Sequence, residues 1–249
     1  MPCRVIQRPE GPKDLIRRPA EPNNLLYSQQ LVLRRVASTV DRRQLKTEER
    51  PVLEVPALSA TQRLVELPSL QLRDARDGRE PRLSTSVRVG LREGVLFVRF
   101  DARDAGVVAT LTERDGPLWT EDVVEVFLSP EDPSRVYYEF EVNPLGALFD
   151  ARVDSPDLSR ATMKVEPAWT CPGFSARVRH GPATWSALLR IPLSPMTPAP
   201  ISSLWRANFY RVDRGNPDEY SAWSPIFTDP PDFHVPERFG FLSLGTLSS

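Results

Sequence analysis

The stretch LWTEDVVEVFLSP, residues 118–130, places a carboxylate inside an apolar run. In an extended chain successive side chains alternate between the two faces of a strand, so Val123, Glu125 and Phe127 share one face. Burying a charged group without a partner costs free energy, so a carboxylate at such a position needs a partner or a ligand. Glu125 is therefore a candidate ligand-binding residue.

A second stretch, VYYEFEVNP at 136–144, gathers polar groups on one face. Its apolar face consists of Tyr138, Phe140 and Val142, and the opposite face consists of Tyr137, Glu139, Glu141 and Asn143. If the two stretches pair as neighbouring strands, one face of the sheet collects carboxylates, an amide and aromatic rings. We expect a site on that face.

Paired carboxylates are the catalytic groups of glycoside hydrolases, one as acid and the other as nucleophile or base. The chemistry depends on the separation of the two groups, which the sequence does not supply. An exposed sheet face on which acids meet arginines is the alternative, so we assign no catalytic residue. The candidates are Glu121, Asp122, Glu125, Glu139 and Glu141.

Other reactive groups lack their sequence signatures. Only His180 and His234 could serve as the base of a nucleophilic triad, and no Gly-x-Ser-x-Gly elbow is present. Cys3 and Cys171 belong to no CxxC or Cys/His cluster, so zinc is not expected. No glycine-rich phosphate loop precedes a helix, and no His/Met spacing favours haem ligation.

Calcium is the metal that the loops suit best, because it takes oxygen ligands from acidic loop residues. The candidate calcium ligands are Asp101 and Asp104, or alternatively Asp150, Asp154 and Asp157. Surface acids without an ion are the alternative. No other cofactor is expected.

Two tryptophans lie in loops near acidic residues. Trp119 follows DGPL, and Trp223 precedes the proline-rich loop 224–236. Aromatic rings in loops stack on the C–H faces of sugars, while carboxylates, amides and arginines bond the hydroxyls. Trp185 and Trp205 fall inside strand candidates and are expected in the core.

Composition predicts the elements that must position these residues. With 249 residues and a net charge of −1, the chain has no basic excess for nucleic acid, and no apolar run is long enough for a membrane helix. The 26 prolines disfavour long helices. Short alternating runs bounded by turn residues, such as STSVRVGL and VLFVRFDA around REG, predict an all-β fold, an antiparallel jelly-roll-like β-sandwich over 51–249.

Residues 1–50 differ from the rest in their arginine pairs and scattered prolines. We expect a poorly ordered or weakly helical extension, with one candidate amphipathic helix at 23–38. The first residues lack the apolar stretch of a signal peptide.

The motifs FDARD, LWTEDVVEVFLSP, YYEFEVNPLGALFDAR, TWSALLRIPL, LWRANFYR, YSAWSP and FGFLSL follow one another between residues 84 and 244. In this order they resemble the family 9 carbohydrate-binding modules, within a wider DOMON-like group of β-sandwiches. The resemblance implies a sandwich that grips a sugar between two tryptophans and holds structural calcium. It also suggests an extracellular or periplasmic location.

The resemblance implies a role for six residues of this chain. Trp119 would be one wall of the sugar site, and Glu125, six positions later, the acidic sugar ligand. Trp223 would be the second wall, and the remaining polar ligands would be Arg152, Asn208 and Arg211.

The sequence therefore predicts a stand-alone, non-catalytic protein that binds a saccharide and is linked to polysaccharide catabolism. Its partner would be a saccharide or polysaccharide chain, not nucleic acid or a membrane. A haem-binding relative, a ligand-free interaction scaffold and, least favoured, a glycoside hydrolase are the alternatives.

Overall fold

The computed structural model describes residues 50–197 and 201–245. The predicted N-terminal extension up to residue 49, with its candidate helix at 23–38 and Cys3, lies outside the described residues. The boundary near residue 50 stays a prediction. No helix in the described part of the chain is both long enough and apolar enough to cross a bilayer.

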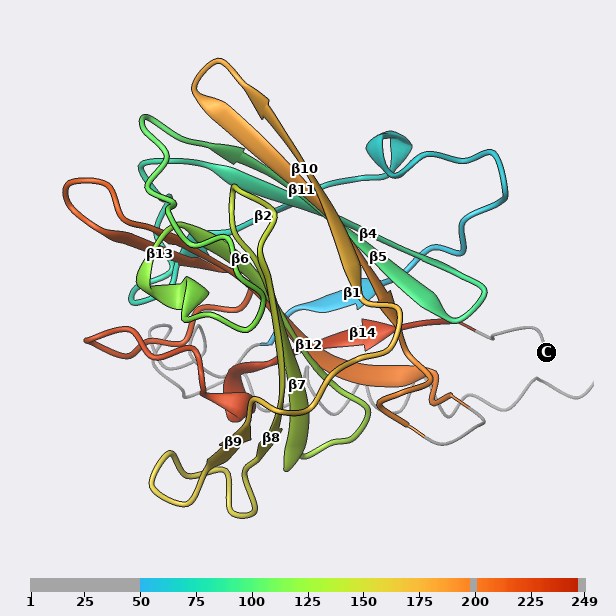
Figure 1. The fold of residues 1–249 in the computed structure, drawn as a ribbon. Coiled ribbons are helices and arrows are strands. Elements are labelled where there is room, and N and C mark those ends of the chain that lie inside the picture. The colour runs from blue at the N-terminus through green and yellow to red at the C-terminus, as the bar shows by residue number, and fades with distance from the viewer. Residues whose placement is uncertain (1–49, 198–200, 246–249) are drawn as a thin grey trace, which may run out of the picture. The chain divides into compact units, whose positions relative to one another are not determined.

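The described chain folds into two β-sheets, which confirms the all-β prediction (Figure 1). The nine-stranded sheet runs in the order β1 (Val52–Glu54), β14 (Gly240–Ser243), β12 (Leu204–Asp213), β6 (Val123–Ser129), β7 (Val136–Val142), β8 (Leu148–Asp154), β9 (Lys164–Glu166), with β13 (Glu219–Ala222) beside β12 and β3 (Arg73–Asp74) beside β13. The five-stranded sheet runs β10 (Ser175–Gly181), β11 (Thr184–Pro192), β5 (Val95–Arg103), β4 (Thr85–Arg92), β2 (Leu70–Gln71).

Named strands pair antiparallel except β1 with β14. Three short 3-10 turns complete the elements of the residues that the structure describes: η1 (Leu64–Glu66), η2 (Leu118–Thr120) and η3 (Pro236–Arg238). The hairpin between β4 and β5 turns at Glu93 and Gly94, which both have positive φ. A two-residue turn with positive φ at both positions matches the right-handed twist of the strands that it joins. That hairpin is the one predicted from REG.

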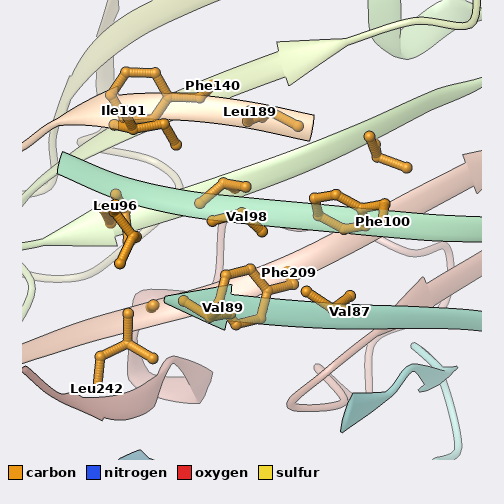
Figure 2. Close-up of a cluster of buried hydrophobic side chains, with 14 of the residues drawn as sticks. Val87, Val89, Leu96, Val98, Phe100, Phe140, Leu189, Ile191, Phe209 and Leu242 are labelled. Carbon is orange, nitrogen blue, oxygen red and sulfur yellow. The ribbon is translucent and has the colours of Figure 1, made fainter. Parts of the chain in front are cut away.

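The main core lies between the two sheets (Figure 2). Alternation along each strand supplies it: Val87 and Val89 from β4 and Val98 and Phe100 from β5 point toward Phe209 of β12. The rings of Phe100 and Phe209 meet edge to face at 6.4 Å. The predicted core tryptophans, Trp185 and Trp205, are buried in this layer.

The other face of the nine-stranded sheet is buried as well. Phe127 of β6, Tyr137 of β7 and Tyr210 of β12 form a second apolar cluster there, together with Phe233 and Ile226 from the loop after β13. Every residue of β6 is consequently buried, including those that alternation places away from the main core. Glu125 therefore lies in a covered layer rather than on an open sheet face.

Candidate functional site

A pocket of about 680 Å³ opens over the second face of the nine-stranded sheet. Strand residues of β6, β7, β8 and β12 supply part of its lining, and loop residues with β9 and β13 supply the rest. The strand residues are Glu125, Phe127, Glu139, Phe149 and Val212; the others are Asp115, Pro117, Trp119, Arg160, Val165, Pro167, Arg214, Tyr220, Pro231, Asp232, Phe233 and His234. Trp119 and Glu125, two of the predicted site residues, thus line one pocket.

Trp119 presents a partly exposed ring to this pocket. Trp119 is the middle residue of η2, and Pro117 precedes this turn. The carbonyl oxygen of Pro117 accepts hydrogen bonds from the backbone N–H (3.1 Å) and the hydroxyl group (2.7 Å) of Thr120. The indole ring packs edge to face against the ring of Phe149, with the ring centres 5.4 Å apart. Trp119 is nevertheless 45% exposed. Phe149 therefore supports the indole ring of Trp119, and part of the ring surface remains exposed for a ligand.

Arg214 joins Trp119 to a second aromatic residue of the pocket. Its guanidinium donates to the carbonyl oxygen of Trp119 (2.6 Å), to the hydroxyl of Tyr220 and to Asp218 (2.7 Å). It also lies 5.3 Å from the centre of the Tyr220 ring. Sequence reasoning missed Arg214 and Tyr220, although both flank the turn just before Trp223.

Phe233 and His234 form another part of the lining. Phe233 stacks on Tyr210 with ring centres 4.1 Å apart, and the Tyr210 hydroxyl donates to the Phe233 carbonyl (3.1 Å). The Nδ1 atom of His234 lies 2.7 Å from the hydroxyl of Tyr137. The proline-rich loop is thereby fixed over the sheet, as a pre-formed pocket requires.

Glu125, Glu139 and Glu141 bring three carboxylates together beneath the pocket. In the β6–β7 pair Glu125 lies opposite Glu141, and Glu139 lies opposite the neighbouring Phe127. One carboxyl oxygen from each lies within 4.8 Å of the others, and all three residues are buried. Glu125 and Glu139 line the pocket, whereas Glu141 lies fully buried behind them.

Burial alters the ionisation of this cluster. Desolvation raises the pKa of Glu125 well above the ordinary value; the charge of Glu139 adds to the rise and that of Arg214 opposes it. Desolvation also raises the pKa of Glu141, with the charges of Glu125 and then Glu139 adding to it. Both carboxyl groups therefore stay protonated to a higher pH than an exposed glutamate does.

Trp223 does not line the pocket, contrary to its predicted role as the second wall. Ala222 pairs with Tyr210, and the next residue, Trp223, donates its N–H to the carbonyl of Phe209. This register turns Trp223 to the inner face, where it is 8% exposed and packs 5.3 Å from the Phe209 ring. It also covers Gly240, where a Cβ atom would come within 2.6 Å of the indole.

Asn208 and Arg152, two predicted polar ligands, also lie outside the lining of the pocket. The buried side chain of Asn208 exchanges hydrogen bonds with the backbone of Ser224, at 2.8 and 2.9 Å, and so anchors the start of the proline-rich loop. Arg152 pairs with Asp154 (2.7 Å) and Glu166 (3.1 Å).

Arg211 and the predicted calcium ligands are engaged with one another or with other arginines. Arg211 bonds Asp104 (3.1 Å) and Asp213, and Asp104 also accepts from the indole of Trp185 (3.1 Å). Asp101 accepts from Arg88 (2.9 Å) and Arg99 (3.0 Å). Guanidinium groups already neutralise both carboxylates, so these two residues fit a calcium ion poorly.

The second predicted set of loop acids is also satisfied by protein groups. Asp150 accepts from Arg114 and from the backbone N–H of Cys171. Asp154 pairs with Arg152, and Asp157 accepts from Thr162 and the backbone of Ser159.

A two-sheet β-sandwich with an aromatic and carboxylate-lined pocket over one sheet has the architecture of a small-molecule-binding module. The family model described as carbohydrate-binding family 9 matches residues 81–244, more than half of the chain. The chain therefore belongs to carbohydrate-binding family 9, and the resemblance seen in its motifs is confirmed.

Solved structures share the fold. A candidate carbohydrate-binding protein from Bacteroides uniformis is 22% identical, with a TM-score of 0.59 over 78% of this chain and 98% of that one. A family 9 carbohydrate-binding module from Caldicellulosiruptor kristjanssonii in complex with cellotriose is 14% identical, with a TM-score of 0.55 over 80% and 95%. A second such structure, with glucose, is 15% identical, with a TM-score of 0.52 over 80% and 97%. A comparison with curated proteins finds no significant match.

Proposed function

We propose that this protein binds a saccharide without transforming it, in the pocket beside Trp119 and Glu125. The observation that carries the proposal is the braced, 45% exposed indole of Trp119 at a pocket that also contains a carboxylate. Family membership supports it, and so do the glucose and cellotriose complexes of modules with the same fold. A link to polysaccharide catabolism is part of the proposal.

The lining offers both kinds of contact that a sugar needs. Trp119 supplies an apolar face for the ring C–H groups, and Tyr220, Phe233 and His234 supply further ring surface in place of Trp223. Glu125 can accept hydrogen bonds from hydroxyl groups. Hydroxyl donors would thereby bond a carboxyl group that no N–H group of residues 50–197 or 201–245 bonds.

The test is isothermal titration of the full chain with a panel of mono- and disaccharides and cellotriose. Trp119→Ala removes the stacking surface, and Leu204→Ala is a matched control, because Leu204 is similarly exposed and absent from the pocket lining. We expect binding of about −4 to −8 kcal/mol, millimolar to micromolar, with the unchanged chain and the control, and none with Trp119→Ala. No heat with any sugar from a folded protein would contradict the proposal and favour the scaffold; a Soret absorbance band would favour haem.

A further inference from the structure

The outward face of the five-stranded sheet is rich in arginine. Strands β4, β5, β10 and β11, which lie side by side (Figure 1), contain seven arginines and one acidic residue, Asp101. Alternation turns the neighbours of these arginines into the main core, so the arginines point away from it. This surface is here called the basic face, and its arginines are Arg88, Arg92, Arg99, Arg103, Arg177, Arg179 and Arg190.

The positive charge of the basic face is a local property. Acidic side chains outnumber basic ones by 27 to 22 in residues 50–249. The strands of the nine-stranded sheet contain ten acidic and five basic residues, so the two sheets have opposite charge balances. A region that is acidic as a whole therefore concentrates arginine on one face, and the summed field of such a surface attracts anions.

The strand register places the side chains of the basic face in rows across β10, β11, β5 and β4. One row consists of Arg177, Leu188, Arg99 and Arg88, and the next of Arg179, Ser186, Asp101 and Ser86. Neighbouring strands lie about 4.8 Å apart, so a row of four residues spans about 14 Å. That length suits an extended ligand better than a single small ion.

Acidic residues of the protein neutralise only part of this charge. Asp101 pairs with Arg99 at 2.5 Å and with Arg88 at 2.9 Å, so two guanidinium groups share one carboxylate. The exposed side chains of Arg103, Arg177 and Arg179 form no ion pair within residues 50–197 and 201–245. These three arginines are therefore available to an anionic ligand.

Two adjoining hollows lie along the basic face. One, of about 470 Å³, has the hydroxyl groups of Ser84 and Thr184 in its lining. The other, of about 320 Å³, lies beside η1. Both are lined by Arg99, Arg179 and Ser186, so they form one groove with cationic and neutral polar side chains.

We propose that the basic face binds an acidic polysaccharide, a chain whose sugar units carry carboxylate groups. A guanidinium group can bind a carboxylate through two parallel hydrogen bonds, which Arg177 and Arg179 are placed to form. The hydroxyl groups of Ser84, Thr184 and Ser186 can bond sugar hydroxyls in the same groove. The chain also belongs to a carbohydrate-binding family, which favours a glycan as the anion.

A single-stranded nucleic acid fits this groove less well. Its bases bind by stacking on aromatic side chains that are accessible. Trp185 in the first hollow is buried, and the guanidinium of Arg92 lies over the ring of Phe97 in the second, 5.1 Å from its centre. Neither ring is open to a base.

The test is isothermal titration of the full chain with an oligogalacturonate, with the neutral galactose oligomer of the same length as the matched ligand. Arg177→Gln/Arg179→Gln removes two cations of the basic face. Arg79→Gln/Arg135→Gln is the control, because both arginines are exposed, lie outside the five-stranded sheet and change the net charge equally. We expect the oligogalacturonate to bind the unchanged chain and the control alike, and the first double variant at least tenfold more weakly. Added salt should weaken that binding.

The Trp119 pocket opens over the other sheet, so this inference does not rest on the proposed function, and Trp119→Ala should bind the oligogalacturonate unchanged. Equal binding by the two double variants would overturn the proposal, and so would a lack of binding by the unchanged chain. A single-stranded oligonucleotide that binds more tightly, and loses affinity with Arg177→Gln/Arg179→Gln, would assign the face to nucleic acid instead. A neutral sugar bound on the basic face would contradict both proposals, since it lacks the charge that this face recognises.

Discussion

The substitution Arg211→Met tests whether Arg211 holds the sandwich together or binds a ligand. Its side chain is 1% exposed and bonds Asp104 at 3.1 Å, together with Asp213, Thr85 and the carbonyl oxygen of Arg103. Methionine removes the cation and leaves two buried carboxylates facing each other. Removing one partner of a buried ion pair costs about 3–5 kcal/mol, so we expect that loss in the free energy of unfolding.

Urea unfolding followed by fluorescence measures this change. For a domain of this size each kcal/mol lowers Tm by about 2–4 °C, so Tm should fall by about 6–20 °C. Arg152→Met is the control: its partners Asp154 and Glu166 are partly exposed, and its loss should cost less than about 1 kcal/mol. A stable Arg211→Met protein that has lost saccharide binding would refute the structural role and restore Arg211 as a ligand.

Three further predictions concern the pocket and its surroundings. Trp223→Ala should destabilise the fold by about 3–5 kcal/mol in urea unfolding, because its ring fills the main core; a loss below about 1 kcal/mol would place that ring elsewhere. Arg214→Met should weaken saccharide binding about tenfold by titration, because it frees Trp119 and Tyr220 from their shared brace, and unchanged affinity would contradict that role. Because burial raises the folded-state pKa of Glu141, the chain should gain stability as pH falls from 8 toward 4.5, and Glu141→Gln should flatten that slope; equal slopes would contradict it.

Much of the fold follows from local pattern. The hairpin at Glu93 and Gly94 and the shared face of Glu125 and Phe127 depend on turn chemistry and strand alternation, which neighbouring residues determine. Alternation does not reveal that both faces of the nine-stranded sheet are covered. The proline-rich loop after β13 covers the second face, and its position depends on contacts such as that of Phe233 with Tyr210.

The site was predictable only in part. Trp119 and Glu125 lie six residues apart in one motif and line the same pocket, whereas Trp223, predicted as the second wall, packs in the main core because its orientation depends on the β12–β13 register. The Arg211–Asp104 ion pair joins residues 107 positions apart, which no local motif indicates. A separation of 95 positions likewise hid the contact of Arg214 with the backbone of Trp119.

The structure of the protein crystallised with its best-binding saccharide tests the central claim most directly. The proposed function predicts a sugar ring stacked on the indole of Trp119, with a hydroxyl group within hydrogen-bonding distance of Glu125. A saccharide bound elsewhere, for example in the hollow of about 470 Å³ beside Arg99 and His180 on the five-stranded sheet, would contradict it.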